Sequence, residues 1–359
     1  MYYPKFSVFV IYIAVFLLCS LKQTNSEVQY IIRNSTDVCS MQPCLTLSQF
    51  AANSSHYHLH SNTTLIFLSG THYLNVKLEI SNQNSFMMNS EHTTAQIVCT
   101  DRSHNFYFRQ LQYVHITDLE FVGCRGNRVE NVNKFVVSIA SFRGLGISER
   151  SSQRQLIRNS ALILIQTRAQ IINSTFVSNK GGSVRANTIF HFQGTIPGSI
   201  SAFSPDSVGG AIFATHCEIE IIQSVFESND ADFGGSIFAE YSTIGVRNGT
   251  VLVNNNATSY GGAICIYSSD MTIEESKLFG NTADEYGGAL CSYNSTAGIK
   301  STTFHSNKAN QHGGVLYIDN STVEIDDGVI FNNSAPIGAV SYLCSRWLSA
   351  AISKYPSSS

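Results

Sequence analysis

The chain has 359 residues, of which 43% are hydrophobic and 13% are charged, and its formal net charge is −3. With no excess of Lys and Arg, it lacks the basic footprint of a nucleic-acid-binding protein. It also contains no Walker loop, no nucleophile elbow and no HExxH motif. The commonest sequence signatures of nucleotide-binding proteins, serine hydrolases and zinc proteases are therefore missing.

Residues 1–26 have the organisation of a secretory signal peptide. Lys5 supplies a positive charge, Phe6 to Leu18 form an apolar core, and Thr24-Asn25-Ser26 is a plausible cleavage site. The alternative is an uncleaved anchor, although the apolar run is short for a membrane span. No second apolar stretch approaches 18 residues. We therefore expect no transmembrane span in the mature chain and a secreted or extracellular-surface location.

Nine N-x-Ser/Thr sequons support export, since glycosylation at such sites marks surface turns of secreted proteins. Chance accounts for some of them in a chain so rich in Asn and Ser. The candidate glycosylation sites are Asn34, Asn53, Asn62, Asn173, Asn248, Asn256, Asn294, Asn320 and Asn332.

Removal of Cys19 with the signal peptide leaves eight cysteines, an even number that suits an oxidising compartment. Three pairs are disulfide candidates. Cys39 and Cys44 bracket a short loop, and Cys99 and Cys124 have a spacing that would join neighbouring coils. Cys265 and Cys291 occupy equivalent positions, where stacking at about 4.8 Å fits the Cα window of a disulfide. The alternative for this last pair is two stacked free thiols. Cys217 and Cys344 have no obvious partner, and no spacing is a CxxC zinc pattern.

Residues 27–205 contain short apolar segments that predict strands without a strict period. These segments are Leu65–Leu68, Leu78–Ile80, Ala95–Val98 and Val114–Ile116. Phe176-Val177-Ser178-Asn179 looks like a Phe-x-x-Asn turn lying close to two periods before Asn229, with a protruding loop between them at 196–206. We interpret residues 127–160 as a long excursion.

From residue 206 onward the sequence repeats with a period of 26 residues. Its most regular feature is a column of asparagines, each preceded three positions earlier by a large apolar residue and followed two positions later by alanine. The asparagines are Asn229, Asn255, Asn281, Asn307 and Asn333. We expect them to bond along the axis as a structural ladder; the alternative is that each one only caps its own turn. A fixed period of this length indicates a solenoid.

Each repeat contains three short strand patterns separated by Ser, Asn, Asp and Gly, which favour tight turns. A Gly-Gly pair opens the clearest strand, as in Gly261-Gly262-Ala263-Ile264-Cys265. The alternation of apolar and other residues has the period of a strand, and no segment between 205 and 345 has a helical pattern. The sequence therefore predicts an all-β fold, a right-handed parallel β-helix with about 26 residues per coil.

We predict one elongated domain over residues 27–345, with irregular coils in 27–205 and regular coils in 206–345. Residues 346–359 form a polar tail without a clear capping element, although the open end of a β-helix needs cover. We expect this tail either to mark a truncated chain or to belong to a chain that pairs end to end.

The Phe-x-x-Asn and Gly-Gly-Ala-Ile elements resemble the repeats of polymorphic outer-membrane proteins and the right-handed β-helices of the pectate-lyase-like superfamily. The resemblance rests on Phe226–Asn229 with Gly209–Ile212 and on Phe304–Asn307 with Gly313–Leu316, and it covers about residues 176–340. It implies a surface-exposed, adhesin-like or structural protein, and it implies no catalytic mechanism.

Parallel β-helices also host polysaccharide lyases and glycoside hydrolases, so an enzyme is the alternative function. Glu274, Lys300 and Asp326 occupy equivalent positions in three successive repeats. A lyase could use such a lysine as a base beside acidic calcium ligands. The simpler interpretation is a surface column of charges worth about 0–1 kcal/mol per pair. We therefore treat the three as weak catalytic candidates and expect no catalysis.

His56, His58 and His60 alternate and would share one face of a strand, which is an arrangement that can bind a transition metal. Between two sequons in a Ser/Asn-rich segment, a solvated loop is the simpler interpretation. We expect no metal and no cofactor.

The predicted function is a secreted or cell-surface, non-catalytic β-helix that presents an extended face to a glycan or protein partner. The candidate contact face is the aromatic column Phe213, Phe238 and Tyr317. The alternative for these rings is packing beneath a loop.

Overall fold

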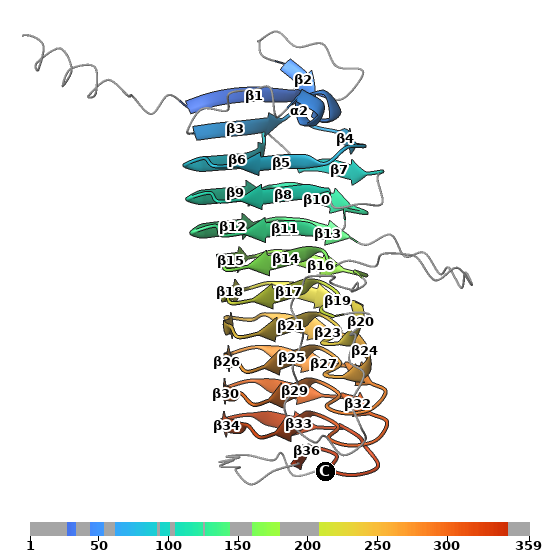
Figure 1. Cartoon of the computed structure of the whole chain (residues 1–359). Coiled ribbons are helices and arrows are strands. Elements are labelled where there is room, and N and C mark those ends of the chain that lie inside the picture. Colours follow the sequence, from blue (N-terminus) through green and yellow to red (C-terminus); the bar gives the residue numbers. More distant parts are fainter. Residues whose placement is uncertain are drawn as a thin grey trace, which may run out of the picture.

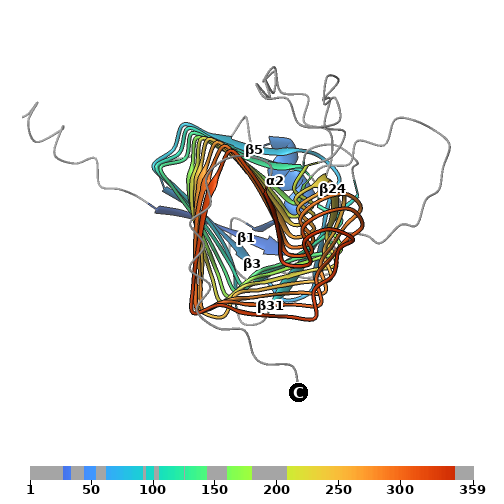
Figure 2. The ribbon, with the colours of Figure 1, turned by 90° about the horizontal axis from the view of Figure 1, so that it is seen from below.

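The structure is a computed structural model that describes residues 27–33, 44–53, 62–91, 94–100, 105–124, 126–143, 160–179 and 208–343. Its strands stack as successive coils along one axis (Figure 1), and most coils contribute one strand to each of three parallel sheets. The β-helix solenoid predicted from the repeat is confirmed. Viewed along the axis, the coils superimpose (Figure 2).

The strands below are given in the order in which they pair among the described residues. Sheet A contains β2 (Cys44–Thr46), β1 (Glu27–Arg33), β3 (Asn62–Phe67), β6 (Ser85–Ser90), β9 (Tyr113–Thr117), β12 (Lys134–Ser138), β15 (Arg168–Ile172), β18 (Glu218–Ile222), β22 (Thr243–Arg247), β26 (Asp270–Glu274), β30 (Thr296–Lys300) and β34 (Thr322–Asp326). Sheet B contains β4 (Thr71–Leu74), β7 (Ala95–Cys99), β10 (Leu119–Val122), β13 (Ser141–Arg143), β16 (Thr175–Val177), β19 (Val225–Glu227), β23 (Val251–Val253), β27 (Lys277–Phe279), β31 (Thr303–His305) and β35 (Val329–Phe331). Sheet C contains β5 (Leu78–Ser81), β8 (Phe106–Arg109), β11 (Asn127–Glu130), β14 (Leu162–Ile165), β17 (Ile212–Thr215), β21 (Ile237–Glu240), β25 (Ile264–Tyr267), β29 (Leu290–Tyr293), β33 (Leu316–Asp319) and β36 (Ser341–Leu343).

Sheet D is a fourth parallel sheet that the sequence analysis did not anticipate. It contains β20 (Asp230–Phe233), β24 (Asn256–Tyr260), β28 (Thr282–Ala283) and β32 (Lys308–Ala309). These strands are the Asn-x-Ala segments, which lie between sheets B and C and appear beside the main coil in Figure 2. Each is too short and too polar to stand out as a strand pattern.

A short helix, α2 (Leu47–Asn53), follows β2 at the N-terminal end of the solenoid (Figure 1). Leu47, Phe50 and Ala51 are buried, and the Phe50 ring meets the Tyr30 ring edge-on with centroids 5.1 Å apart. The helix therefore supplies apolar cover to the first coils. Within the described residues, no helix is long and apolar enough to cross a membrane.

Strand alternation sorts the side chains between two apolar clusters. In β25, Ile264 and Ile266 lie in the main core, whereas Cys265 and Tyr267 lie in a second cluster on the outer side of sheet C. Packing in the main core is coil on coil: the rings of Phe142 and Phe176 stack with centroids 4.9 Å apart. A side chain thus packs against its own counterpart in the next coil.

The ladder asparagines form one column that is buried from Asn229 to Asn307, and Asn281 illustrates their bonding. Its Oδ1 accepts hydrogen bonds of 3.0 Å from both the backbone N and the Nδ2 of Asn255. Its Nδ2 donates to the carbonyl of Leu252 and to Oδ1 of Asn307, each at 3.0 Å. Each such side chain therefore joins its own coil to the coils before and after it.

The Gly-Gly pair is required by two different constraints. Gly261 has φ +67°, in the left-handed region, and a Cβ there would overlap the carbonyl oxygen of Ile264. Gly262 packs so closely on the next coil that a Cβ would overlap the carbonyl oxygen of Gly288. The first glycine shapes the turn, and the second permits the coil spacing.

Two predictions about the N-terminal half were wrong. Residues 127–143 contribute β11, β12 and β13 to the regular sheets and are not an excursion. Phe176 stacks directly on Phe226 and Asn179 bonds directly to Asn229, so these turns belong to adjacent coils and are not two periods apart. Their spacing of 50 residues is close to two periods because residues 180–207 are inserted between them.

Candidate functional site

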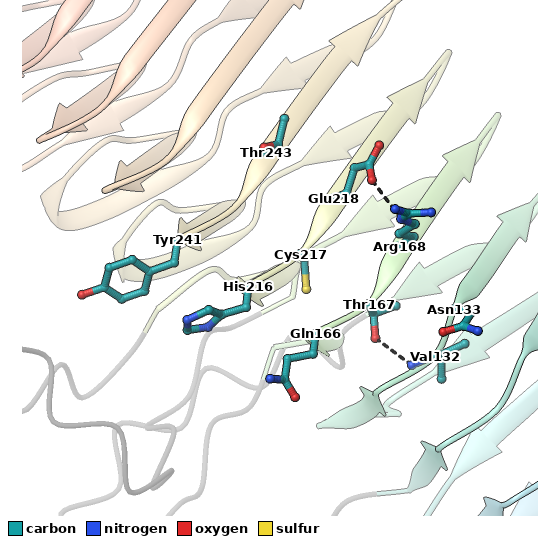
Figure 3. Close-up of a pocket in the computed structure, with 10 residues that line it drawn as sticks. All are labelled: Val132, Asn133, Gln166, Thr167, Arg168, His216, Cys217, Glu218, Tyr241 and Thr243. Atoms are coloured by element: carbon teal, nitrogen blue, oxygen red, sulfur yellow. Dashed lines mark hydrogen bonds and ion pairs between the residues drawn. The ribbon is translucent and has the colours of Figure 1, made fainter.

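An open pocket of about 710 Å³ lies at the corner where the chain passes from sheet C to sheet A. Figure 3 shows the side chains that line it, which come from four successive coils. They are Val132, Asn133, Gln166, Thr167, Arg168, His216, Cys217, Glu218, Tyr241 and Thr243. At one strand spacing per coil, these coils extend about 14 Å along the axis.

The pocket lies where this corner changes length. Between sheets C and A, the coils before it use three residues, as at 131–133, and the coils after it use two, as at 166–167. Asn133 is therefore the extra residue, with no counterpart in the coil that follows. Its Nδ2 donates to Oε1 of Gln112 in the preceding coil, and Asn133 lines the pocket next to the shorter turns.

The shorter turns are fixed by a second buried polar column. Each of these two-residue turns begins with a residue whose φ is positive, in the left-handed region. The second residue is small and polar, and its side chain accepts a hydrogen bond from a backbone N–H of the preceding coil. The backbone N–H groups of Cys217 and Ser242 donate in this way to Oγ of Ser242 and Ser269, each at 3.0 Å. The column consists of Thr167, Cys217, Ser242, Ser269, Ser295 and Ser321.

The charges in the pocket are paired. Nε of Arg168 lies 3.0 Å from Oε2 of Glu218, and both side chains are mostly exposed (77% and 62%). Figure 3 shows the two side chains facing one another across adjacent strands. A surface pair of this kind stabilises the fold little, but it leaves the pocket lining without net charge.

Two aromatic rings form the C-terminal part of the pocket. The His216 and Tyr241 rings stack with centroids 5.1 Å apart, and Tyr241 also meets Tyr267 edge-on at 5.9 Å. Nδ1 of His216 is 2.9 Å from the hydroxyl of Thr215, which orients the imidazole. Figure 3 shows Gln166, His216 and Tyr241 directed to the same side of the ribbon.

The thiol in the pocket has a raised pKa. Burial raises the pKa of Cys217 to about 11, partly offset by backbone N–H donors, and its Sγ donates to the carbonyl of Thr215 at 3.2 Å. The thiol is therefore protonated at neutral pH, whereas catalytic cysteines react as thiolates. Cys217 acts as a member of the polar column.

The weak catalytic candidates lie elsewhere. Glu274, Lys300 and Asp326 stack in register on sheet A, as the repeat predicts, and none of them lines the pocket. Glu274 is bound by Arg247, whose Nη1 lies 3.0 Å from its Oε2 and whose Nε lies 3.2 Å from Oε2 of Glu220. Within the described residues, no ion pair joins Lys300 to either carboxylate.

The disulfide candidates behave differently from one another. Cys99 and Cys124 form a disulfide with Cα atoms 4.9 Å apart; Val98 pairs with Val122, so the two cysteines are one residue out of register. Cys44 is also disulfide-bonded, whereas Cys39, the partner predicted for it, lies outside the described residues.

The predicted Cys265–Cys291 disulfide was wrong, because both thiols are free. The two residues are direct register partners on β25 and β29. Side chains at equivalent positions of parallel strands point the same way, so their Cβ atoms are about 4.8 Å apart. A disulfide needs Cβ atoms within about 3.5–4.5 Å, a tighter condition than the Cα distance used in the prediction.

The predicted aromatic contact face is buried. Phe213, Phe238 and Tyr317 are only 2–3% exposed. They belong to the second apolar cluster together with Phe233 and Tyr260, which come from the strands of sheet D. The rings are packing residues, as the alternative held, but strands of sheet D cover them and not a loop.

The candidate glycosylation sites fall into distinct environments. Asn173, Asn248, Asn294, Asn320 and Asn332 are exposed at corners and have positive φ. Asn256 lies within sheet D, where its Nδ2 donates to Oδ1 of Asp230 and its Oδ1 accepts from the hydroxyl of Thr282. Asn62 begins β3 and accepts from Ser85, Asn53 ends α2, and Asn34 lies outside the described residues.

Several sequence predictions fall on residues outside the described ranges: the signal peptide, His56, His58, His60, Cys344 and the tail. Among the described residues, no group of three or more His, Cys, Asp and Glu side chains could hold a metal ion.

Sequence reasoning missed the pocket and the polar column beside it. A signal for the column was present, because a Ser, Thr or Cys stands immediately before the first residue of each sheet A strand from β15 onward. The pocket itself lies where one turn between sheets C and A is a residue longer than the next, and this difference cannot be seen within any single repeat.

No protein-family model and no curated protein sequence matches the chain. Among solved structures, the chain is similar to the crystal structure of PfbA, a surface adhesin of Streptococcus pneumoniae, with 10% sequence identity and a TM-score of 0.28. The match covers 78% of this chain and 85% of that chain. A similarity this distant carries no argument about function.

Proposed function

We propose that this chain is a secreted or cell-surface, non-catalytic β-helix module, adhesin-like or structural, that binds a glycan or protein partner outside the cell. The observation that carries the proposal is the corner pocket. It is open to solvent and lined with polar side chains, with an aromatic pair at one end. Concave sites with a few convergent polar groups are where proteins bind ligands.

The chemistry of the pocket favours binding over turnover. Its thiol is protonated because burial raises the pKa of Cys217, and the carboxylate of Glu218 is neutralised by Arg168. A general base or nucleophile needs to be free and near its reactive protonation state. The column Glu274, Lys300 and Asp326 lies on an open sheet face, with Glu274 already bound by Arg247.

An extracellular location is supported by the disulfide chemistry. The Cys99–Cys124 bond and the bonded Cys44 suit an oxidising compartment. Five sequons at exposed corners fit the same location. The proposal also includes the signal peptide in residues 1–26 and the similarity of the repeats to those of polymorphic outer-membrane proteins.

The test uses the protein secreted from eukaryotic cells. We expect the purified chain to bind cell surfaces or extracellular matrix in a saturable manner. We also expect it to release no sugar from a polysaccharide panel, with or without calcium. Release of unsaturated sugars that is lost in Lys300→Ala would replace the proposal by a lyase, and absence of any saturable binding would remove it.

A further inference from the structure

We propose that the corner pocket binds neutral carbohydrate, with the Tyr241 ring as the surface on which a sugar ring packs. This inference rests on the proposed function, because it names the ligand class of the same pocket. Three observations support it: Tyr241 is exposed, some polar side chains of the pocket lining make no hydrogen bond among the described residues, and the charges of Arg168 and Glu218 cancel.

Tyr241 is a large ring held in place at the surface. It is 46% exposed, although His216 stacks on it and Tyr267 meets it edge-on. A ring fixed in this way loses little side-chain entropy on binding, and Tyr combines an apolar body with a polar end. The face of a sugar ring is similarly made of C–H groups surrounded by hydroxyls.

Other groups of the pocket lining can both donate and accept hydrogen bonds. Among the described residues, no hydrogen bond engages the side chains of Gln166 and Thr243, and the bond that His216 makes uses Nδ1 and not Nε2. Amide, hydroxyl and imidazole groups each suit a hydroxyl, which itself donates and accepts. A ligand rich in hydroxyls would satisfy all three.

The charge pattern selects a neutral ligand. Arg168 already pairs with Glu218 at 3.0 Å, so an acidic sugar would have to displace a carboxylate to reach the guanidinium. It would also approach the Glu218 carboxylate, which would repel its negative charge, and repulsion of this kind is a common source of specificity. A neutral sugar meets neither obstacle.

A protein partner fits the pocket less well. The core of a protein interface is apolar and well packed. Here the apolar lining is covered, because Val132 is only 1% and Cys217 only 6% exposed. The accessible lining consists of polar groups and two rings, and the volume is in the range of small-ligand sites.

The test is a titration with defined oligosaccharides. The purified chain is screened against neutral glycans ending in glucose, galactose, mannose or N-acetylhexosamine and against sialylated and sulfated glycans. The strongest neutral binder is then titrated by calorimetry into wild type, Tyr241→Ser and Thr243→Val. Ser is chosen for position 241 because φ is +47° there and Ser268 occupies the same corner in the next coil with φ of 45°, whereas Asn would create an Asn-Ser-Thr sequon in the pocket.

The matched control is Tyr73→Ala, which removes an aromatic ring that is 59% exposed on β4, far from the pocket. We expect neutral glycans to bind, Tyr241→Ser to weaken binding at least tenfold, Thr243→Val to weaken it severalfold and the control to bind as wild type. Circular dichroism checks that each variant is folded.

Binding of acidic glycans alone, or undiminished binding by Tyr241→Ser, would overturn the inference. If no glycan binds but the chain still attaches saturably to cells or matrix proteins, the inference is wrong and the proposed function stands. If the chain attaches to nothing, both are wrong.

Discussion

The rings of Phe176 and Phe226 stack with centroids 4.8 Å apart and planes within 1° of parallel, although residues 180–207 separate their coils in the sequence. This contact shows that the solenoid continues unbroken across the insertion. The backbone agrees, because Asp230 N donates to the carbonyl of Asn179 at 2.9 Å, as Asn256 N does to Asn229 one coil later.

We therefore expect the coils to form without residues 180–207. In the next coil, Asp230, Ala231 and Asp232 join Asn229 to Phe233, and Val208 pairs with Phe233. Replacing residues 180–207 by Asp-Ala-Asp should leave the β-sheet circular dichroism spectrum unchanged and the melting temperature within about 5 °C of wild type. Loss of cooperative melting in this variant would show that the insertion supports the coils.

The asparagine column should be a major source of stability. Asn281→Ala removes a fully buried amide and leaves the donors of Asn255 and the carbonyl of Leu252 without their partner. Since each buried group left unsatisfied costs about 1–3 kcal/mol, we expect a loss of roughly 3–5 kcal/mol in denaturant titrations. The matched control is Asn310→Ala at an exposed position, with an expected change below about 0.5 kcal/mol. Equal losses in the two variants would contradict a special role for the column.

Glu240 should make stability depend on pH. It is 1% exposed between Thr215 and Tyr267, and burial raises its pKa from 4.5 to about 7, opposed by a hydrogen bond from Thr215. Below pH 4.5 the carboxyl is neutral whether the chain is folded or unfolded. As pH rises towards 7 only the unfolded chain ionises, so stability falls by about 3 kcal/mol over this window and then levels off.

The measurement compares unfolding free energies at pH 5 and pH 8. Glu240→Gln keeps the shape of the side chain but cannot ionise, so its stability should change less than that of wild type over this interval. Glu227→Gln, at an exposed position on β19, is the control and should follow wild type. A Glu240→Gln variant with the full wild-type pH dependence would assign the effect to other groups.

The thiols of Cys265 and Cys291 should be protected in the folded chain. They are 5% and 4% exposed, and the hydrogen bond between the thiols together with burial raises the pKa of Cys291 well above its ordinary value. Iodoacetamide should leave both unmodified in the native protein and modify both in guanidinium, as read by peptide mass spectrometry. Recovery of a peptide pair linked through these two cysteines would show that the stacked thiols oxidise after all.

The sequence was sufficient to predict stacking where the period is constant. The spacing of Asn229 to Asn333 identifies equivalent positions, and strand alternation then places Ile264 inside and Cys265 outside. The same pattern fails at Phe176, because an insertion there happens to make one coil nearly as long as two.

What covers an outward-facing residue could not be predicted from alternation. Phe213 and Phe238 point outward as expected, but Phe233 and Tyr260 come from a different part of the repeat and pack over them. The pocket was missed for a related reason. It lies beside Asn133, the residue by which one turn is longer than the next, and this difference is seen only when the two coils are compared in space.

The amide column is bonded in the same way on each regular coil from Asn229 to Asn307, so the regular part of the solenoid could lengthen or shorten in whole coils. Excising the segment between two equivalent asparagines would bring identical donors and acceptors together again, whereas a cut of any other size would misalign them. Gain or loss of a single repeat by duplication or recombination would thus change the length of the solenoid by one strand spacing, about 4.8 Å, and the same hydrogen bonds would form at the new junction.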